Sequence, residues 1–162
     1  MAVLNRTKKG DYLSVGTITD SPTYAYMGLS FTEVGDSPSA VTGEKKYVGM
    51  VSASKSIKGY NWSAAFSCDQ VPDADAVEDI RSIGENEVTG SDAERYYVKV
   101  DLSATAAAGA YPAKRRKVAV EVSDFPNDDG DLQISGNLLG VTDWENGTFN
   151  TTTLAWSAAA EG

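Results

Sequence analysis

The chain has 162 residues, with 23 acidic and 14 basic side chains, a formal net charge of −9, one cysteine and no histidine. This length suits a single domain that buries roughly two thirds of the surface of its unfolded form. The negative charge argues against general attraction to nucleic acid or to an anionic membrane, and one cysteine excludes an intrachain disulfide and a thiolate metal site. Because histidine, the commonest general base and metal ligand, is missing, we expect neither an enzyme nor a bound cofactor.

The first residues contain no apolar run of signal-peptide length, and no later stretch approaches a membrane span. We therefore expect a soluble protein that is made in a cytoplasm. The glycosylation sequons at Asn61, Asn146 and Asn150 have no meaning without a secretion signal.

Apolar and polar residues alternate along several segments, which is the pattern of a strand with one buried face. The expected strands are residues 23–34, 59–69, 94–102, 117–123, 131–140 and 147–156. The side chains expected on their apolar faces include Tyr60, Trp62, Ala64, Phe66, Cys68, Tyr96, Val98, Val100, Leu102, Val118, Val120, Val122, Leu132, Ile134 and Leu138. This number of strands predicts a β-sandwich or barrel of mostly antiparallel neighbours.

One helix is expected among the strands, over residues 72–86. Its apolar residues recur every three to four positions, as in an amphipathic helix that packs against a sheet; they are Ala76, Val77, Ile80 and Ile83. We expect Asp73 or Asp75 to be the N-cap and Gly84 to be the C-cap.

The segment between Val34 and Val48 has no apolar period and is rich in Gly, Ser and Pro. We interpret it as a long loop or a mobile hairpin, because a loop of this length in a compact domain is usually functional or disordered. Both ends of the chain are expected to be arms, and no internal repeat or domain linker divides the sequence.

Residues 125–136, FPNDDGDLQISG, allow two interpretations, a calcium loop or a turn between strands. An EF-hand loop needs oxygen ligands at alternating positions before its glycine and a glutamate after it. Here Phe125 occupies a ligand position, and the residues from Leu132 onward do not supply the bidentate glutamate of such a loop. The dipeptide Asp129-Gly130 tolerates positive φ and separates two alternating segments, so we favour the turn.

The only dense basic run is KRRK, at residues 114–117. It could bind phosphate or act in nuclear targeting. In an acidic protein, a solvated strand edge or a contact with acidic surface on a neighbouring subunit is the favoured role. In the long loop, Lys45 and Lys46 follow Glu44 and could hold the loop against another chain, and charge alone leaves a merely solvated loop equally open.

The three tryptophans could form a ligand-stacking set. Trp62 lies on the apolar face of an expected strand, which favours core packing. For Trp144 and Trp156 the sequence does not decide between the two roles.

The order of the segments adds a resemblance. DYLSVG, YAYMGLSFTE, the Pro-containing polar loop, KKYVGMVSASKSIKGYNWSAAFSCDQ, VEDIRSIG, ERYYVKVDL, YPAKRRKVAVEVSDF, GDLQISGNLLG and GTFN follow one another along the chain. Together they resemble the major tail (tail tube) proteins of phages and prophages of Gram-positive bacteria, over about residues 11–150. The Ala-rich C-terminal tail matches no pattern.

The resemblance implies a mainly β, tail-tube-like sandwich or barrel with one flanking α-helix and a long extended loop, all in one domain over residues 1–162. It implies hexameric rings that stack into a hollow conduit for DNA in the virion, with DNA passing through without specific binding. Ring-to-ring contact would use the loop at about 35–47 and the terminal arms, and tape measure, terminator and distal tail proteins would be partners. The expected inter-subunit contacts are Asp36, Glu44, Lys45, Lys46, Lys114, Arg115, Arg116 and Lys117.

Two other functions remain open. A capsid or head decoration protein would share the β fold but bind a preformed lattice. A carbohydrate-binding β-sandwich module would use exposed Trp and Tyr. Self-polymerisation separates the tail tube subunit from both.

Overall fold

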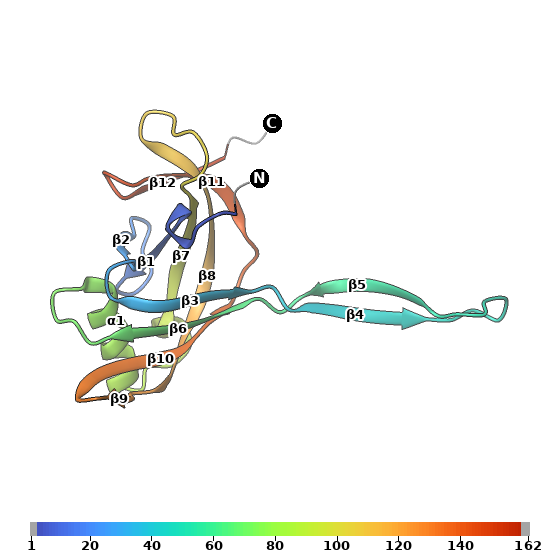
Figure 1. The fold of residues 1–162 in the computed structure, drawn as a ribbon, viewed down its shortest axis with the longest axis horizontal. Helices are drawn as coiled ribbons and strands as arrows, with labels where there is room; N and C mark the ends of the chain where they lie inside the picture. The colour runs from blue at the N-terminus through green and yellow to red at the C-terminus, as the bar shows by residue number, and fades with distance from the viewer. Residues whose placement is uncertain (1–2, 160–162) are drawn as a thin grey trace.

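A long antiparallel sheet organises the chain, and the computed structural model describes residues 3–159 of it (Figure 1). The strands are β1 (Lys9–Val15), β2 (Thr23–Tyr26), β3 (Phe31–Ser37), β4 (Ala40–Lys45), β5 (Ser54–Tyr60), β6 (Ser63–Asp69), β7 (Glu94–Asp101), β8 (Ala110–Asp124), β9 (Asn127–Asp128), β10 (Asp131–Gly140), β11 (Glu145–Asn150) and β12 (Ala155–Ala158). The helices are α1 (Asp75–Glu85) and the 3-10 turns η1 (Arg6–Lys8) and η2 (Gly90–Ala93). The mainly β fold with one α-helix is confirmed, and the described sheet does not close into a barrel.

The main path of the sheet runs β2-β1-β7-β8-β10-β6-β3, and every pairing in it is antiparallel. Strand β8 is 15 residues long and divides the sheet. Along one edge it pairs with β7, and along the other its first part pairs with β11 and its last part with β10. The sheet therefore forks at β8, with β11 and β12 forming one branch and β10, β6 and β3 the other.

Two apolar clusters lie on opposite faces of this sheet, so β7 is buried on both sides. Tyr97 points into the cluster under α1, and its neighbour Val98 points into the second cluster. The second cluster consists of Tyr12, Tyr24, Val98, Val100, Ala113 and Phe149. The sequence pattern correctly places Val98 and Val100 together, but it misses Tyr97, because strict alternation assumes that the other face meets solvent.

Helix α1 buries the predicted stripe of Ala76, Val77, Ile80 and Ile83. Its predicted caps are wrong. The N-cap is Ala74, which makes no side-chain hydrogen bond, and the C-cap is Asn86. Gly84 lies inside the helix, and a Cβ there would come within 2.7 Å of Phe125 Cζ and 2.8 Å of Val122 Cγ1. This glycine therefore permits close packing of α1 on β8.

Four strand predictions are corrected. Residues 147–156 are not one strand but parts of β11 and β12, which are joined by a turn and pair with each other. Residues 23–34 form two strands, β2 and β3, separated at Met27–Ser30. Tyr60 belongs to β5 and is 62% exposed, because it precedes the point where the chain re-enters the main sheet as β6. Leu132 is 56% exposed, beyond the part of β10 that pairs with β6.

The turn prediction is confirmed. Asp129 and Gly130 have φ values of 52° and 90°, and they connect β9 to β10 in antiparallel register. The Gly130 N–H donates to Asn127 Oδ1 at 2.9 Å. Positive φ at both central positions is the backbone that Asp-Gly adopts most readily in a two-residue hairpin.

Candidate functional site

A two-stranded hairpin projects far from the sheet (Figure 1). We name residues 40–60 the hairpin arm. It consists of β4, β5 and the connection between them, and it continues the pairing of β3 with β6 outward from the body. The predicted loop at 35–47 is thus the end of β3 and the first half of this arm. An isolated two-stranded hairpin is marginally stable in water at best, so the arm gains little stability from its own pairing.

Apolar side chains along the hairpin arm face solvent. Val51 is 95% exposed and Ile57 is 59% exposed. The exposed large apolar residues of the arm are Val41, Tyr47, Val48, Val51, Ile57 and Tyr60. A concentration of exposed apolar side chains of this kind is typical of surfaces that contact another molecule.

The hairpin arm is also basic. It carries Lys45, Lys46, Lys55 and Lys58 against Glu44 alone, a net charge of +3 in a chain of −9. The rest of the chain is therefore strongly acidic. A basic, apolar arm on an acidic body is complementary in charge to another copy of the same body.

The four contact residues that were expected outside the basic run divide into two groups. Glu44, Lys45 and Lys46 lie exposed on the hairpin arm, where Lys45 Nζ sits 5.2 Å from the Tyr47 ring centroid. Asp36 instead lies in β3 at the base of the arm and is bound within its own chain. Whether any of them contacts another chain stays a prediction.

Asp36 ties the base of the arm to the body. Its carboxylate accepts hydrogen bonds from Trp62 Nε1 and from Lys99 Nζ, the latter at 2.6 Å. Partial burial opposes ionisation of Asp36, but the two donors and the charge of Lys99 outweigh it and lower the pKa of the carboxyl.

The basic run at 114–117 was expected to be a solvated strand edge or a subunit contact. The strand edge is wrong. The run lies inside β8, where β7 pairs along one side and β11 pairs with Lys114 and Arg115 on the other. Arg115 forms an ion pair with Glu145 at 2.8 Å and hydrogen bonds to the Tyr24 hydroxyl at 3.0 Å. Arg116 is 9% exposed and donates two hydrogen bonds to the Thr142 carbonyl.

The two arginines also decide the role of the tryptophans. Arg116 stacks over Trp62 and Trp144, at 4.8 and 5.0 Å from the ring centroids. Arg115 lies 5.0 Å from the centroid of Trp156. Each tryptophan therefore contacts an arginine of its own chain, which is a structural use of cation–π attraction.

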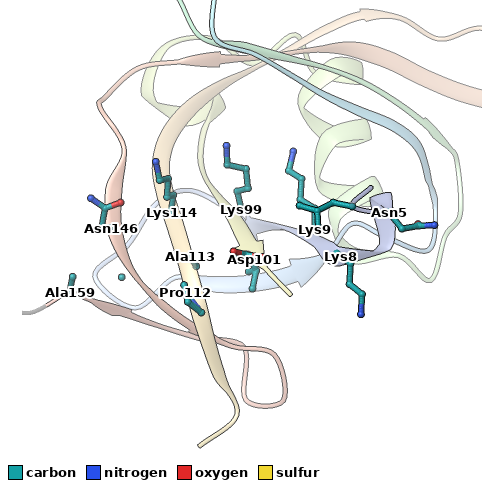
Figure 2. A pocket seen from close by; sticks show the side chains of 13 residues that line it. Asn5, Lys8, Lys9, Lys99, Asp101, Pro112, Ala113, Lys114, Asn146 and Ala159 are labelled. Carbon is teal, nitrogen blue, oxygen red and sulfur yellow. The ribbon is translucent and has the colours of Figure 1, made fainter. Parts of the chain in front are cut away.

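A second surface, which the sequence analysis did not predict, lies where η1, β7, β8 and β11 come together (Figure 2). It is a groove of about 500 Å³ that we name the lysine groove. It is lined by Leu4, Asn5, Lys8, Lys9, Lys99, Val100, Asp101, Pro112, Ala113, Lys114, Asn146, Gly147 and Ala159. Figure 2 shows Lys9, Lys99 and Lys114 rising in the same direction from the neighbouring strands β1, β7 and β8.

Two carboxylates near the lysine groove already form ion pairs within the chain. Asp36 binds Lys99, and Asp11 binds Arg6 and the Tyr97 hydroxyl while lying 3.7 Å from Lys9 Nζ. Partial burial, the largest influence, lowers the pKa of Lys9. Lys114 was expected to be a contact residue, but the sequence could not group it with Lys8, Lys9 and Lys99, because strand pairing brings them together.

Comparisons with known proteins give a likeness of fold. No protein-family model matches the chain, and neither does any curated protein sequence. Across residues 3–159, no helix has the length and hydrophobicity needed to cross a bilayer. Among solved structures, the chain is similar to one chain of the six-fold symmetrised cryo-EM structure of the anti-feeding prophage baseplate. The TM-score is 0.54 at 13% identity, over 90% of this chain and 95% of that one. The chain thus shares its fold with a component of a prophage baseplate structure.

Proposed function

We propose that this protein is a structural subunit of a phage tail or a related particle, and that it assembles into rings that stack as a tail tube. The observation that carries the proposal is the hairpin arm, an apolar and basic hairpin that projects from an acidic body. Burying its apolar side chains on a neighbouring copy would provide the main driving force for assembly.

The shared fold supports the same proposal. The similar chain comes from a prophage baseplate structure to which six-fold symmetry was applied. A ring of six copies requires a heterologous interface, in which one surface of a subunit meets a different surface of the next. The outermost strands of the main path, β2 and β3, leave unpaired backbone groups that such an interface can use.

In this role the protein performs no catalysis and needs no cofactor. Its partners would be further copies of itself and other tail proteins, including tape measure, terminator and distal tail proteins, within the virion. DNA would pass through the conduit without specific binding, consistent with the net charge of −9.

The experiment is negative-stain electron microscopy of the purified protein over a range of concentrations, with size-exclusion chromatography. We expect hollow tubes or stacked rings from the natural chain, and folded monomers from the double variant Val48→Ser, Val51→Ser. Both positions lie on the arm and are almost fully exposed, so the change removes contact surface and leaves the core intact. A matched control is Leu29→Ser, which removes a side chain that is 92% exposed on the body.

A second candidate follows from the baseplate origin of the similar chain. A baseplate-type subunit would form a single ring that starts a tube and would not continue it. Isolated rings that never stack at high concentration would favour this role. Monomers that stay monomeric at every concentration, and tubes that form normally without the arm side chains, would each refute the arm mechanism.

A further inference from the structure

The lysine groove has more positive charge than its own chain neutralises. Within residues 3–159, no carboxylate oxygen lies within 4.0 Å of the amino group of Lys8 or Lys114. The one carboxylate among the lining residues, Asp101, accepts two hydrogen bonds from Ser103, at 3.0 and 2.5 Å. Two lysines at the groove therefore have no carboxylate partner: Lys114, which rises beside Lys9 and Lys99, and Lys8, which points the opposite way (Figure 2).

Strand register makes this arrangement unfavourable in the isolated subunit. Lys99 on β7 stands directly opposite Lys114 on β8. Like charges that face each other across two strands are destabilising, and Asp36 neutralises only Lys99. A negatively charged partner that contacts the Lys114 amino group would offset the charge that remains. The apolar wall, which includes Leu4 and Pro112, would contact the less polar side of that partner.

The chain itself contains a segment with the complementary chemistry. We name residues 127–132 the acidic turn. Asp128, Asp129 and Asp131 are exposed around the β9–β10 hairpin, and the neighbouring Leu132 is 56% exposed. The hairpin arm cannot fill the groove in this way, because the arm and the groove are both basic.

The two surfaces lie at opposite ends of the body. In Figure 1, β9 is at one end of the sheet, and the N-terminus and β11, which border the groove, are at the other. No copy can therefore place its acidic turn in its own groove. A turn that docks in the groove of the next copy forms a heterologous, head-to-tail contact, which repeats in a ring if the rotation between copies closes and in an open chain if it does not.

We propose that the acidic turn of one copy binds in the lysine groove of the next copy. This inference rests on the proposed self-assembly and names a second contact for it, separate from the hairpin arm. The contact pairs three aspartates with the lysines of the groove and packs Leu132 against its apolar wall.

Charge reversal tests the pairing. The groove variant is Lys8→Glu with Lys114→Glu, which changes only lysines without a carboxylate partner. The turn variant is Asp128→Lys with Asp131→Lys, which spares Asp129 because of its φ of 52°. We expect each variant to fold and to raise the concentration needed for assembly roughly tenfold at low salt, as for two or three surface ion pairs. We expect the chain that carries all four changes to regain assembly.

A crossed combination identifies the occupant. The turn variant is also combined with Lys45→Glu and Lys46→Glu on the hairpin arm. Rescue by the arm changes and not by the groove changes would show that the acidic turn receives the arm, and it would overturn the inference. Groove variants that assemble normally but lose binding to a short DNA duplex would also overturn it, because the groove would then be a phosphate site.

A disulfide experiment tests the contact even if no tubes form. A chain with Asp128→Cys is mixed with a chain with Lys114→Cys at high concentration under mild oxidation. Native Cys68 does not interfere, because it is fully buried and burial, the largest cause, raises its pKa to about 12. We expect the mixed disulfide dimer to exceed random pairing and to fall at high salt. A control mixture replaces Lys114→Cys with Lys46→Cys.

The outcomes separate the two proposals. Mixed dimers from a protein that forms no tubes would support the head-to-tail contact and contradict the tail tube. Tubes from the natural chain, together with random disulfide pairing and normal assembly of both charge variants, would support the tail tube and overturn this inference.

Discussion

Replacing Asp36 by asparagine should weaken the junction between the hairpin arm and the body. The substitution keeps the size of the side chain and one acceptor for Trp62 Nε1, but it removes the negative charge that faces Lys99 Nζ at 2.6 Å. The side chains of Asp36 and Lys99 are 22% and 27% exposed, so water only partly compensates for the lost partner.

The magnitude follows from the type of bond. A hydrogen bond to a charged group contributes about 1.5–3 kcal/mol, and partial exposure of both partners favours the lower half of that range. We therefore expect the free energy of unfolding to fall by about 2 kcal/mol. For a domain of this length, that corresponds to a decrease in Tm of about 4–8 °C.

The assay is urea denaturation followed by circular dichroism at several pH values. The pKa of Asp36 is lowered in the folded chain, so its contribution is complete above the unfolded value of about 3.9 and is lost as pH falls through the folded pKa. The difference between the natural chain and Asp36→Asn should therefore be constant near pH 7 and shrink in acid. Glu33→Gln is the control, since it removes an exposed acid of the same strand that forms no ion pair in the described chain.

Two results would refute the reasoning. A loss of stability no larger than that of Glu33→Gln would show that the bond to Lys99 contributes nothing. A difference that persists unchanged below pH 3 would show that the effect does not come from the charge of Asp36.

Two further predictions concern a closely packed glycine and a buried cysteine. Gly84→Ala should lower the free energy of unfolding, because overpacking against Val122 and Phe125 typically costs about 1–3 kcal/mol, more than the ~1 kcal/mol that alanine gains over glycine in a helix. Urea denaturation checks this, and a more stable variant would contradict the packing. Cys68 should not react with a thiol reagent at pH 8 in the folded chain and should react fully in urea, because it is buried and its pKa is raised to about 12. Fast reaction without denaturant would contradict the buried position.

Patterns within one element were predictable from the sequence. The alternation of Val118 and Val120, and the stripe that ends at Ile83, depend only on the geometry of a strand or a helix. The Asp129-Gly130 turn depends on the backbone preferences of two adjacent residues. The C-cap prediction was wrong because Gly84 meets a need for close packing on β8 and is not a cap.

The surroundings of the charged residues were decided by the tertiary structure. Asp36 and Lys99 are 63 positions apart and meet only because β3 and β7 belong to one curved sheet. Arg115 and Arg116 look like surface charges in sequence, but each is held by partners from distant segments. Arg115 pairs with Glu145, and Arg116 is buried against Trp62 and Trp144.

By itself, the sequence therefore determined the strand periods, the helix, the turn, the acidity and the absence of histidine. It also located the polar, Gly- and Pro-containing stretch that begins the hairpin arm. Only the tertiary structure decided that this stretch projects as a hairpin and that lysines from distant strands form one groove. The physical reason is that side-chain period is a property of each strand, whereas register and neighbour order arise from burying two apolar clusters at once.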